Sequence, residues 1–250
     1  MSSNTLRMCH LYPDLLNLYG DRANLLALRR RCEWRGFRLD LHTVGIGEQF
    51  DPAAYDLVLL GGGQDAEQAR VGEDLSHGNG EAIRTAVEAG VVFLCVCGGL
   101  QMMGRFYVAA DGSTVPGLGA IDLETHAGSV RMIGDVSGTS GILRAAGRDP
   151  LLVGFENHGG RTFLGQSSPL GKVVHGHGNN GKDGHEGVRD GSLIGTYLHG
   201  PLLPKNAWLA DHLIATALEH HHGERPELEP LEDELERAAH QTALTAARNG

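Results

Sequence analysis

Several features that would direct this chain to a membrane, an oxidising compartment or a nucleic acid are missing from its 250 residues. Its longest apolar runs are far too short to cross a bilayer. The first five residues lack the basic and apolar regions of a signal peptide. The net charge is −10 and no basic cluster is long enough to indicate nucleic-acid binding. We therefore expect a cytoplasmic protein that neither binds nucleic acid nor inserts into a membrane.

Cysteine is scarce, with residues only at positions 9, 32, 95 and 97. Their spacing matches neither a zinc site nor a disulfide framework. Cys95 and Cys97 lie two apart on one expected strand, so they cannot easily bridge each other. A reducing compartment is the setting that suits these thiols.

The first hundred residues alternate between strand and helix patterns. Asp21 is expected to cap the first helix and Gly36 to end it. This alternation predicts an α/β fold, with a mostly parallel sheet flanked by helices on both faces. Ligands of such sheets bind at the carboxyl ends of the strands. Strands are predicted at 6–12, 37–44, 55–60 and 91–96, and helices at 22–34 and 81–89.

The remaining chain has shorter apolar runs. Residues 121–188 combine such runs with glycine-rich turns, which predicts an antiparallel extension to the sheet. A last buried strand at 193–198 and an amphipathic helix at 204–218 follow. We assign residues 1–223 to one domain and residues 224–250 to an acidic, partly helical C-terminal tail.

Cys97 lies where the buried strand at 91–96 turns into a helical pattern. The unpaired N–H groups and the dipole of a helix N-terminus favour a thiolate, which is the form a nucleophilic cysteine needs. Gly98 and Gly99 allow the backbone to turn tightly there. The alternative is a buried structural cysteine at the end of a core strand.

His199 ends another predicted buried strand, so its imidazole can lie beside Cys97 and exchange protons with it. A surface or structural histidine is the alternative. The Gly61-Gly62-Gly63 turn follows the strand at 55–60. Its backbone N–H groups, together with that of Gly98, could stabilise an oxyanion, although a plain connecting turn has the same pattern.

Two other motifs carry less weight. Residues 176–183 match G-x-G-x-x-G and nearly match a P-loop, but Asp183 replaces the required Ser or Thr and no helix pattern follows. We therefore predict no nucleotide site at this loop. Four histidines between 158 and 185 lack the spacing and the partners of a metal site.

Taken together, these residues resemble a family. Cys97-Gly-Gly-Leu-Gln and Thr196-Tyr-Leu-His-Gly resemble class I glutamine amidotransferases of the branch similar to cobyric acid synthase, whose fold is a flavodoxin-like three-layer sandwich. More closely, residues 6–218 resemble the glutaminase subunits of lipid II isoglutaminyl synthases. The stretches that carry this closer resemblance are Leu11-Tyr-Pro-Asp, Tyr19-Gly-Asp-Arg-Ala-Asn, Gly61-Gly-Gly-Gln-Asp, Gly154-Phe-Glu-Asn-His-Gly-Gly-Arg-Thr, Gly176-His-Gly-Asn-Asn and Gly195-Thr-Tyr-Leu-His-Gly-Pro-Leu-Leu-Pro-Lys-Asn.

The resemblance implies a glutaminase reaction. Cys97 would attack the side-chain amide of L-glutamine, and His199 would move the protons. The N–H groups of Gly62 or Gly63 and of Gly98 would form the oxyanion hole. Arg131 falls where the family places an arginine that binds substrate, and a guanidinium there could pair with the α-carboxylate of glutamine; an exposed strand arginine is the alternative. Gln101, one helical turn after Cys97, could line the pocket.

The sequence departs from most class I amidotransferases at the third catalytic position. They carry a glutamate two positions after the histidine, where this chain has Pro201. Either Glu156 orients the imidazole, or a partner subunit supplies a carboxylate. The resemblance favours the partner, a MurT-like Mur ligase subunit that forms a heterodimer with this chain.

That partner would also hold ATP and Mg, since this chain is expected to bind no cofactor. Ammonia from glutamine would amidate the α-carboxyl of D-glutamate in lipid II, a step of peptidoglycan synthesis. Two alternatives stay open. One is an amidotransferase of the cobyric acid synthase type, and the other is a catalytically silent subunit that only stabilises a partner.

Overall fold

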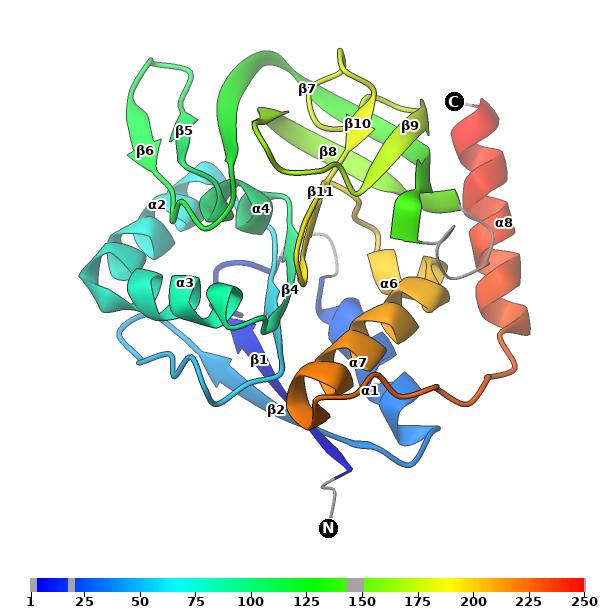
Figure 1. The fold of residues 1–250 in the computed structure, drawn as a ribbon. Helices are drawn as coiled ribbons and strands as arrows, with labels where there is room; N and C mark the ends of the chain where they lie inside the picture. Colours follow the sequence, from blue (N-terminus) through cyan, green and yellow to red (C-terminus); the bar gives the residue numbers. More distant parts are fainter. Residues whose placement is uncertain (1–3, 18–20, 143–150, 250) are drawn as a thin grey trace.

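The computed structural model describes residues 4–17, 21–142 and 151–249, and it contains two sheets (Figure 1). The first sheet has the strand order β11-β12-β4-β3-β1-β2. Its strands are parallel except β11, which pairs antiparallel with β12. Their bounds are β1 (Thr5–Leu11), β2 (Arg38–Val44), β3 (Leu57–Leu60), β4 (Val92–Val96), β11 (Val188–Asp190) and β12 (Leu193–Thr196).

Helices cover both faces of this sheet, as its apolar strands require. β3 and β4 are buried along their whole length, which is typical of a parallel sheet covered on both sides. Figure 1 shows α1 and α7 on one side of the strands and α2 and α3 on the other. A short π-helical segment, η2, joins α2 to α3. The bounds are α1 (Arg22–Glu33), α2 (Asp65–Asp74), η2 (Leu75–Asn79), α3 (Gly80–Glu88), α4 (Gly98–Met103) and α7 (Ala207–His222).

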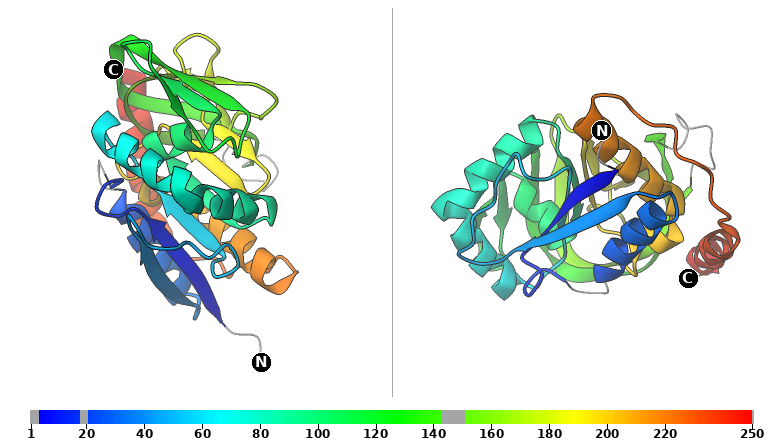
Figure 2. Two further views of the ribbon diagram at one scale, coloured as in Figure 1. Left: turned by 90° about the vertical axis from the view of Figure 1, so that its left-hand side faces the viewer. Right: turned by 90° about the horizontal axis from the view of Figure 1, so that it is seen from below.

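The second sheet lies beyond the carboxyl ends of the parallel strands (Figure 2, left). Its centre is the long strand β7, which pairs with β5, β8 and β9, and a register shift between Ala127 and Met132 interrupts its pairing with β8. The bounds are β5 (Phe106–Val108), β6 (Thr114–Pro116), β7 (Leu123–Ser140), β8 (Leu151–Leu164), β9 (Gly171–His175) and β10 (His185–Glu186).

The α/β fold with a mostly parallel, helix-flanked sheet is confirmed. The antiparallel extension is present as β11 alone, at the edge of the first sheet. The other strands of this region form the second sheet around β7 instead of joining the first. One backbone bridge, Phe155 to His199, joins the two sheets at the end of β12. Helix α2 was not expected from the sequence.

The tail forms a helix, α8 (Glu234–Asn249), that packs on the rest of the chain (Figure 1). Leu244 and Ala247 of α8 are buried. His240 Nδ1 lies 2.8 Å from the carbonyl oxygen of Lys205, in the short helix α6 (Leu202–Lys205). Among the described residues, no helix is both long and apolar enough to span a bilayer.

A buried ion cluster fixes the start of this tail. Arg31 of α1 donates from Nε to Asp211 of α7 over 2.6 Å and from a terminal nitrogen to Asp233 over 2.7 Å. Arg35 donates to the same Asp211 carboxylate over 2.9 Å. The side chains of Arg31 and Arg35 are each only 3% exposed, so these charges depend on their partners for stabilisation.

We expect Asp211→Ala to lower the free energy of unfolding by about 3 kcal/mol, because it leaves two buried guanidinium groups underpaired. Urea denaturation measures this. The matched control is Glu33→Ala, which removes the exposed Arg30–Glu33 pair and should cost about 0.5 kcal/mol or less. Equal losses in the two variants would contradict this view of the cluster.

Candidate active site

Cys97 occupies a sharp turn between β4 and α4. Its backbone has φ 51° and ψ −105°, a conformation that residues other than glycine rarely adopt. Gly99, two residues after Cys97, is required sterically, since a Cβ on it would lie 2.3 Å from the carbonyl oxygen of Leu60. The predicted strand-to-helix turn at Cys97 is therefore confirmed.

Hydrogen bonds across the sheet bring His199 to this turn. The N–H of Cys97 donates to the carbonyl oxygen of Thr196 over 2.8 Å, which ties the turn to the end of β12. Three residues on, His199 is buried, and its backbone pairs with Phe155 of β8. A Cβ placed on Gly62 would lie 3.2 Å from Cε1 of His199 and 3.4 Å from Cβ of Cys97. The three residues therefore meet at one point, as the sequence predicts for strand ends of one sheet.

The environment of His199 favours its protonated form. Burial lowers the pKa of His199, but the side chains of Asp21 and Cys97 outweigh burial and raise that pKa to about 9. An imidazolium beside a cysteine favours the thiolate form of its sulfur. The arrangement can therefore supply both a nucleophile and a proton donor.

Asp21 is the site residue that the sequence interpretation missed. It stands at the N-cap position of α1 but makes no capping hydrogen bond, so its prediction as a helix cap is wrong. Its Oδ2 instead accepts the N–H of Gly62 over 2.7 Å, and its Oδ1 lies 3.7 Å from Nδ1 of His199. The motif Tyr19-Gly-Asp-Arg-Ala-Asn was the available signal; Tyr19 and Gly20 lie outside the described residues.

The three predicted oxyanion-hole glycines have different surroundings. The N–H of Gly62 is engaged by Asp21. The backbone nitrogen of Gly63 lies 3.1 Å from the position of a Cβ on Gly98, so Gly63 and Gly98 are neighbours. Gln68 of α2 donates to the carbonyl oxygen of Gly63 over 3.0 Å and fixes this loop. Gly63 and Gly98 are thus better placed than Gly62 to donate to a ligand.

A cavity of about 480 Å³ opens over Cys97 and His199. Arg131 lines it, and Asn157 holds the guanidinium: Nε donates to Oδ1 over 3.0 Å and a terminal nitrogen donates to the carbonyl oxygen over 2.9 Å. Gln101 also lines the cavity, and its Nε2 donates to the hydroxyl of Tyr197 over 2.9 Å. The structure therefore brings both predicted substrate-binding residues to the same cavity as the thiol.

Glu156, the in-chain candidate for the third catalytic residue, lies next in sequence to Phe155, and successive residues of a strand point to opposite faces. Its buried carboxylate accepts the N–H groups of His177 and Gly178 over 2.7 and 2.9 Å. The glycine-rich loop that resembles a phosphate site is thus wrapped around a carboxylate of the same chain. Glu156 also lies 3.6 Å from Nε2 of His158, which lines the cavity and was considered only as a metal ligand in the sequence analysis.

No group of three His, Cys, Asp or Glu residues that could hold a metal ion occurs in the described ranges.

Comparison with known proteins points to the same chemistry. Residues 7–207 match the model of the CobB/CobQ-like glutamine amidotransferase domain. The chain is similar to the GatD subunit of lipid II isoglutaminyl synthase (glutamine-hydrolyzing) from Streptococcus pneumoniae, with 39% identity over 92% of this chain and 87% of that protein. The GatD subunit from Staphylococcus aureus is 39% identical over 86% of this chain and 85% of its own length.

The fold has known counterparts too. A chain in the structure of PurLQS from Thermotoga maritima superposes with a TM-score of 0.55 at 18% identity, covering 85% of this chain and 95% of that one. At this identity the likeness shows the fold alone.

The strained backbone at Cys97 gives a stability prediction. We expect Cys97→Gly to be more stable than Cys97→Ala by about 1 kcal/mol, because glycine adopts this φ and ψ without the Cβ clash that alanine keeps. Both variants lack the thiol, so chemical denaturation compares backbone strain, which must outweigh the greater unfolded-chain entropy of glycine. An alanine variant as stable as the glycine variant would contradict a strained turn.

Proposed function

This chain belongs to the family of CobB/CobQ-like glutamine amidotransferase domains, and we propose that it is the glutamine-hydrolysing subunit of a lipid II isoglutaminyl synthase. The observation that carries the proposal is the meeting of Cys97, His199 and the Gly63–Gly98 pair at one cavity. The identity to two GatD subunits over most of both chains supports the choice of pathway.

The reaction begins with glutamine in the cavity. The thiolate of Cys97 attacks the side-chain amide carbon, and the negative charge that develops on the oxygen is stabilised by the N–H groups of Gly63 and Gly98. The imidazolium of His199 donates its proton to the departing nitrogen, the C–N bond breaks, and ammonia leaves. A glutamyl thioester remains on Cys97.

Water completes the cycle. Neutral His199 accepts a proton from water, and the resulting hydroxide attacks the thioester carbon. The C–S bond breaks, glutamate departs, and the thiolate–imidazolium pair is restored. Arg131 binds the α-carboxylate of glutamine through charge-assisted hydrogen bonds, since its guanidinium is already oriented by Asn157.

The ammonia is used by a partner. Amidation of a carboxylate requires its activation, and we assign the ATP and Mg for that step to a MurT-like Mur ligase subunit. The relatives are named as subunits, which supports a partner for this chain. The acceptor is the α-carboxyl of D-glutamate in lipid II, and we place the pair in the cytoplasm. Ammonia must travel between the two sites shielded from water.

The direct test of this function is reconstitution with the ligase subunit from the same organism. We expect weak glutamine hydrolysis by this chain alone, faster hydrolysis in the pair, and lipid II amidation that requires both glutamine and ATP. Cys97→Ala should abolish glutamine-dependent amidation and leave amidation from added ammonia intact. Glutamine-dependent amidation by the Cys97→Ala pair would refute the assignment.

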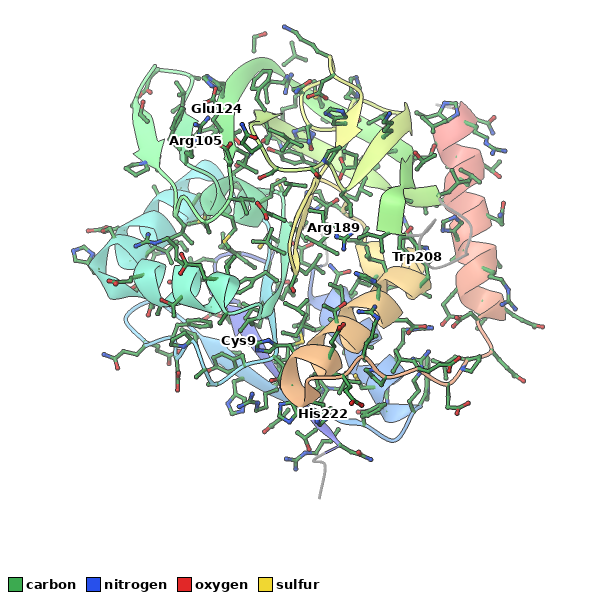
Figure 3. All side chains as sticks on the ribbon, in the orientation of Figure 1. Cys9, Arg105, Glu124, Arg189, Trp208 and His222 are labelled. Atoms are coloured by element: carbon green, nitrogen blue, oxygen red, sulfur yellow. The ribbon has the colours of Figure 1, made fainter. Side chains whose placement is uncertain are left out.

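Arg131 gives a second prediction. We expect Arg131→Gln to raise the KM for glutamine about tenfold to a hundredfold with a smaller change in kcat, because it removes charge-assisted hydrogen bonds made by bound substrate. Steady-state glutaminase assays measure both constants. The control is Arg105→Gln. Arg105 lies beside Glu124 (Figure 3), with which it forms an ion pair at 3.0 Å, and it is not among the residues that line the cavity. An unchanged KM in Arg131→Gln would show that this arginine does not bind glutamine.

A further inference from the structure

Asp21 is a fully buried carboxylate between the oxyanion loop and the catalytic histidine. We propose that Asp21 is a positioning residue for glutamine hydrolysis, which holds His199 as a correctly oriented imidazolium and withdraws the Gly62 N–H from the oxyanion hole. This inference rests on the proposed function and gives the catalytic dyad an orienting acid from within the chain.

The burial of Asp21 requires compensation. A carboxylate removed from water is costly unless hydrogen bonds and an opposite charge stabilise it. Oδ2 receives the Gly62 N–H over 2.7 Å. Oδ1 makes no hydrogen bond within the described ranges and lies 3.7 Å from Nδ1 of His199. A protonated His199 is the group that compensates this oxygen.

The geometry also defines the orientation of the imidazole. With Nδ1 facing Asp21, Nε2 is the nitrogen left to exchange protons with the thiol and the substrate. The distance of 3.7 Å is that of an ion pair and is too long for a hydrogen bond. Catalytic contacts of this kind are often long without substrate and shorten when substrate binds.

Asp21 has a second effect through Gly62. Its hydrogen bond to the Gly62 N–H fixes the loop after β3, and that loop also carries Gly63. Gly63 is therefore held against Gly98 by the same carboxylate that faces His199. In Asp21→Asn the loss of negative charge should affect the protonation of His199 directly. The Gly62 N–H can still donate to the oxygen of the asparagine amide, so the loop can keep its position.

The other titratable groups near His199 have different surroundings. Burial raises the pKa of Glu186 in β10 to about 7, although the charge of His199 lowers it. Its Oε1 accepts the hydroxyl of Thr196 and the N–H of Tyr197, while its Oε2 makes no hydrogen bond in the described ranges. Cys97 faces the imidazole from the turn, and His10 of β1 faces Asp21. Glu156 binds the loop at His177 and Gly178. Asp21 is thus the carboxylate within ion-pair distance of His199 in the described chain.

The test compares Asp21→Asn with Glu156→Gln in the assembled pair and in this chain alone, with glutamine hydrolysis followed across pH. Asp21→Asn should lower kcat about a hundredfold or more with little change in KM. The alkaline limb of its pH–rate profile should move to lower pH, because loss of the negative charge of Asp21 lowers the pKa of His199. Glu156→Gln, the matched neutralisation of a buried carboxylate beside another histidine, should leave the alkaline limb in place.

An Asp21→Asn enzyme with an unchanged alkaline limb and a kcat within threefold of wild type would overturn the proposal. A wild-type rate for Asp21→Asn in the assembled pair, together with a low rate for the same variant alone, would also overturn it, since the partner would then supply the orienting acid. Wild-type hydrolysis is measured in parallel, so a failure of the proposed function appears as an inactive wild type and is distinguished from a failure of Asp21.

A second measurement requires neither a variant nor turnover. Nitrogen NMR of wild-type protein at alkaline pH, with the His199 signals assigned by their loss in His199→Asn, identifies which ring nitrogen of neutral His199 carries the proton. Asp21 should hold the proton on Nδ1, the nitrogen that faces it. A neutral His199 protonated on Nε2 would contradict the inference.

Discussion

The register of three neighbouring parallel strands determines the rest of this site. Leu60 of β3 pairs with Cys95 of β4, and Val96 pairs with Thr196 of β12. The three strands therefore end together, and the residues that follow them meet at one edge. A slip of one residue would turn every side chain to the opposite face and separate the thiol from the imidazole. β3 and β4 are apolar and buried along their whole length, so close packing of their differently sized side chains against the helices on both faces holds this register.

The chemistry at this edge opposes stability. Cys97 holds a backbone conformation that is unfavourable for a side chain, and Asp21 and His199 are charged groups removed from water. The surrounding core supplies what these groups need: close contact at Gly99, a backbone donor at Gly62 and mutual charge compensation. The apolar parallel sheet beneath the site provides the packing that holds these polar groups and the strained turn in place.

The sequence predicted the parts of the site that depend on local patterns. The apolar run that ends at Cys97 and the paired glycines identified the turn, and strand alternation placed His199 on a neighbouring strand. Asp21 could not be found this way, because an acid before a helix is normally a cap and its contact with Gly62 spans 41 positions. The second sheet was missed for a related reason: short alternating strands do not reveal which edge they join. Helix α2 (Asp65–Asp74) was not predicted because it has few apolar residues and contains Gly72, so its helical pattern is weak.

The central claim is that Cys97 forms a covalent glutamyl thioester with help from His199. Rapid acid quenching during glutamine turnover, followed by mass spectrometry of the cysteine peptides, tests it most directly. The account predicts one glutamyl group on Cys97, none on Cys95, which lies two residues earlier in β4, and little adduct in His199→Asn. An adduct on Cys95, or full adduct formation in His199→Asn, would contradict it.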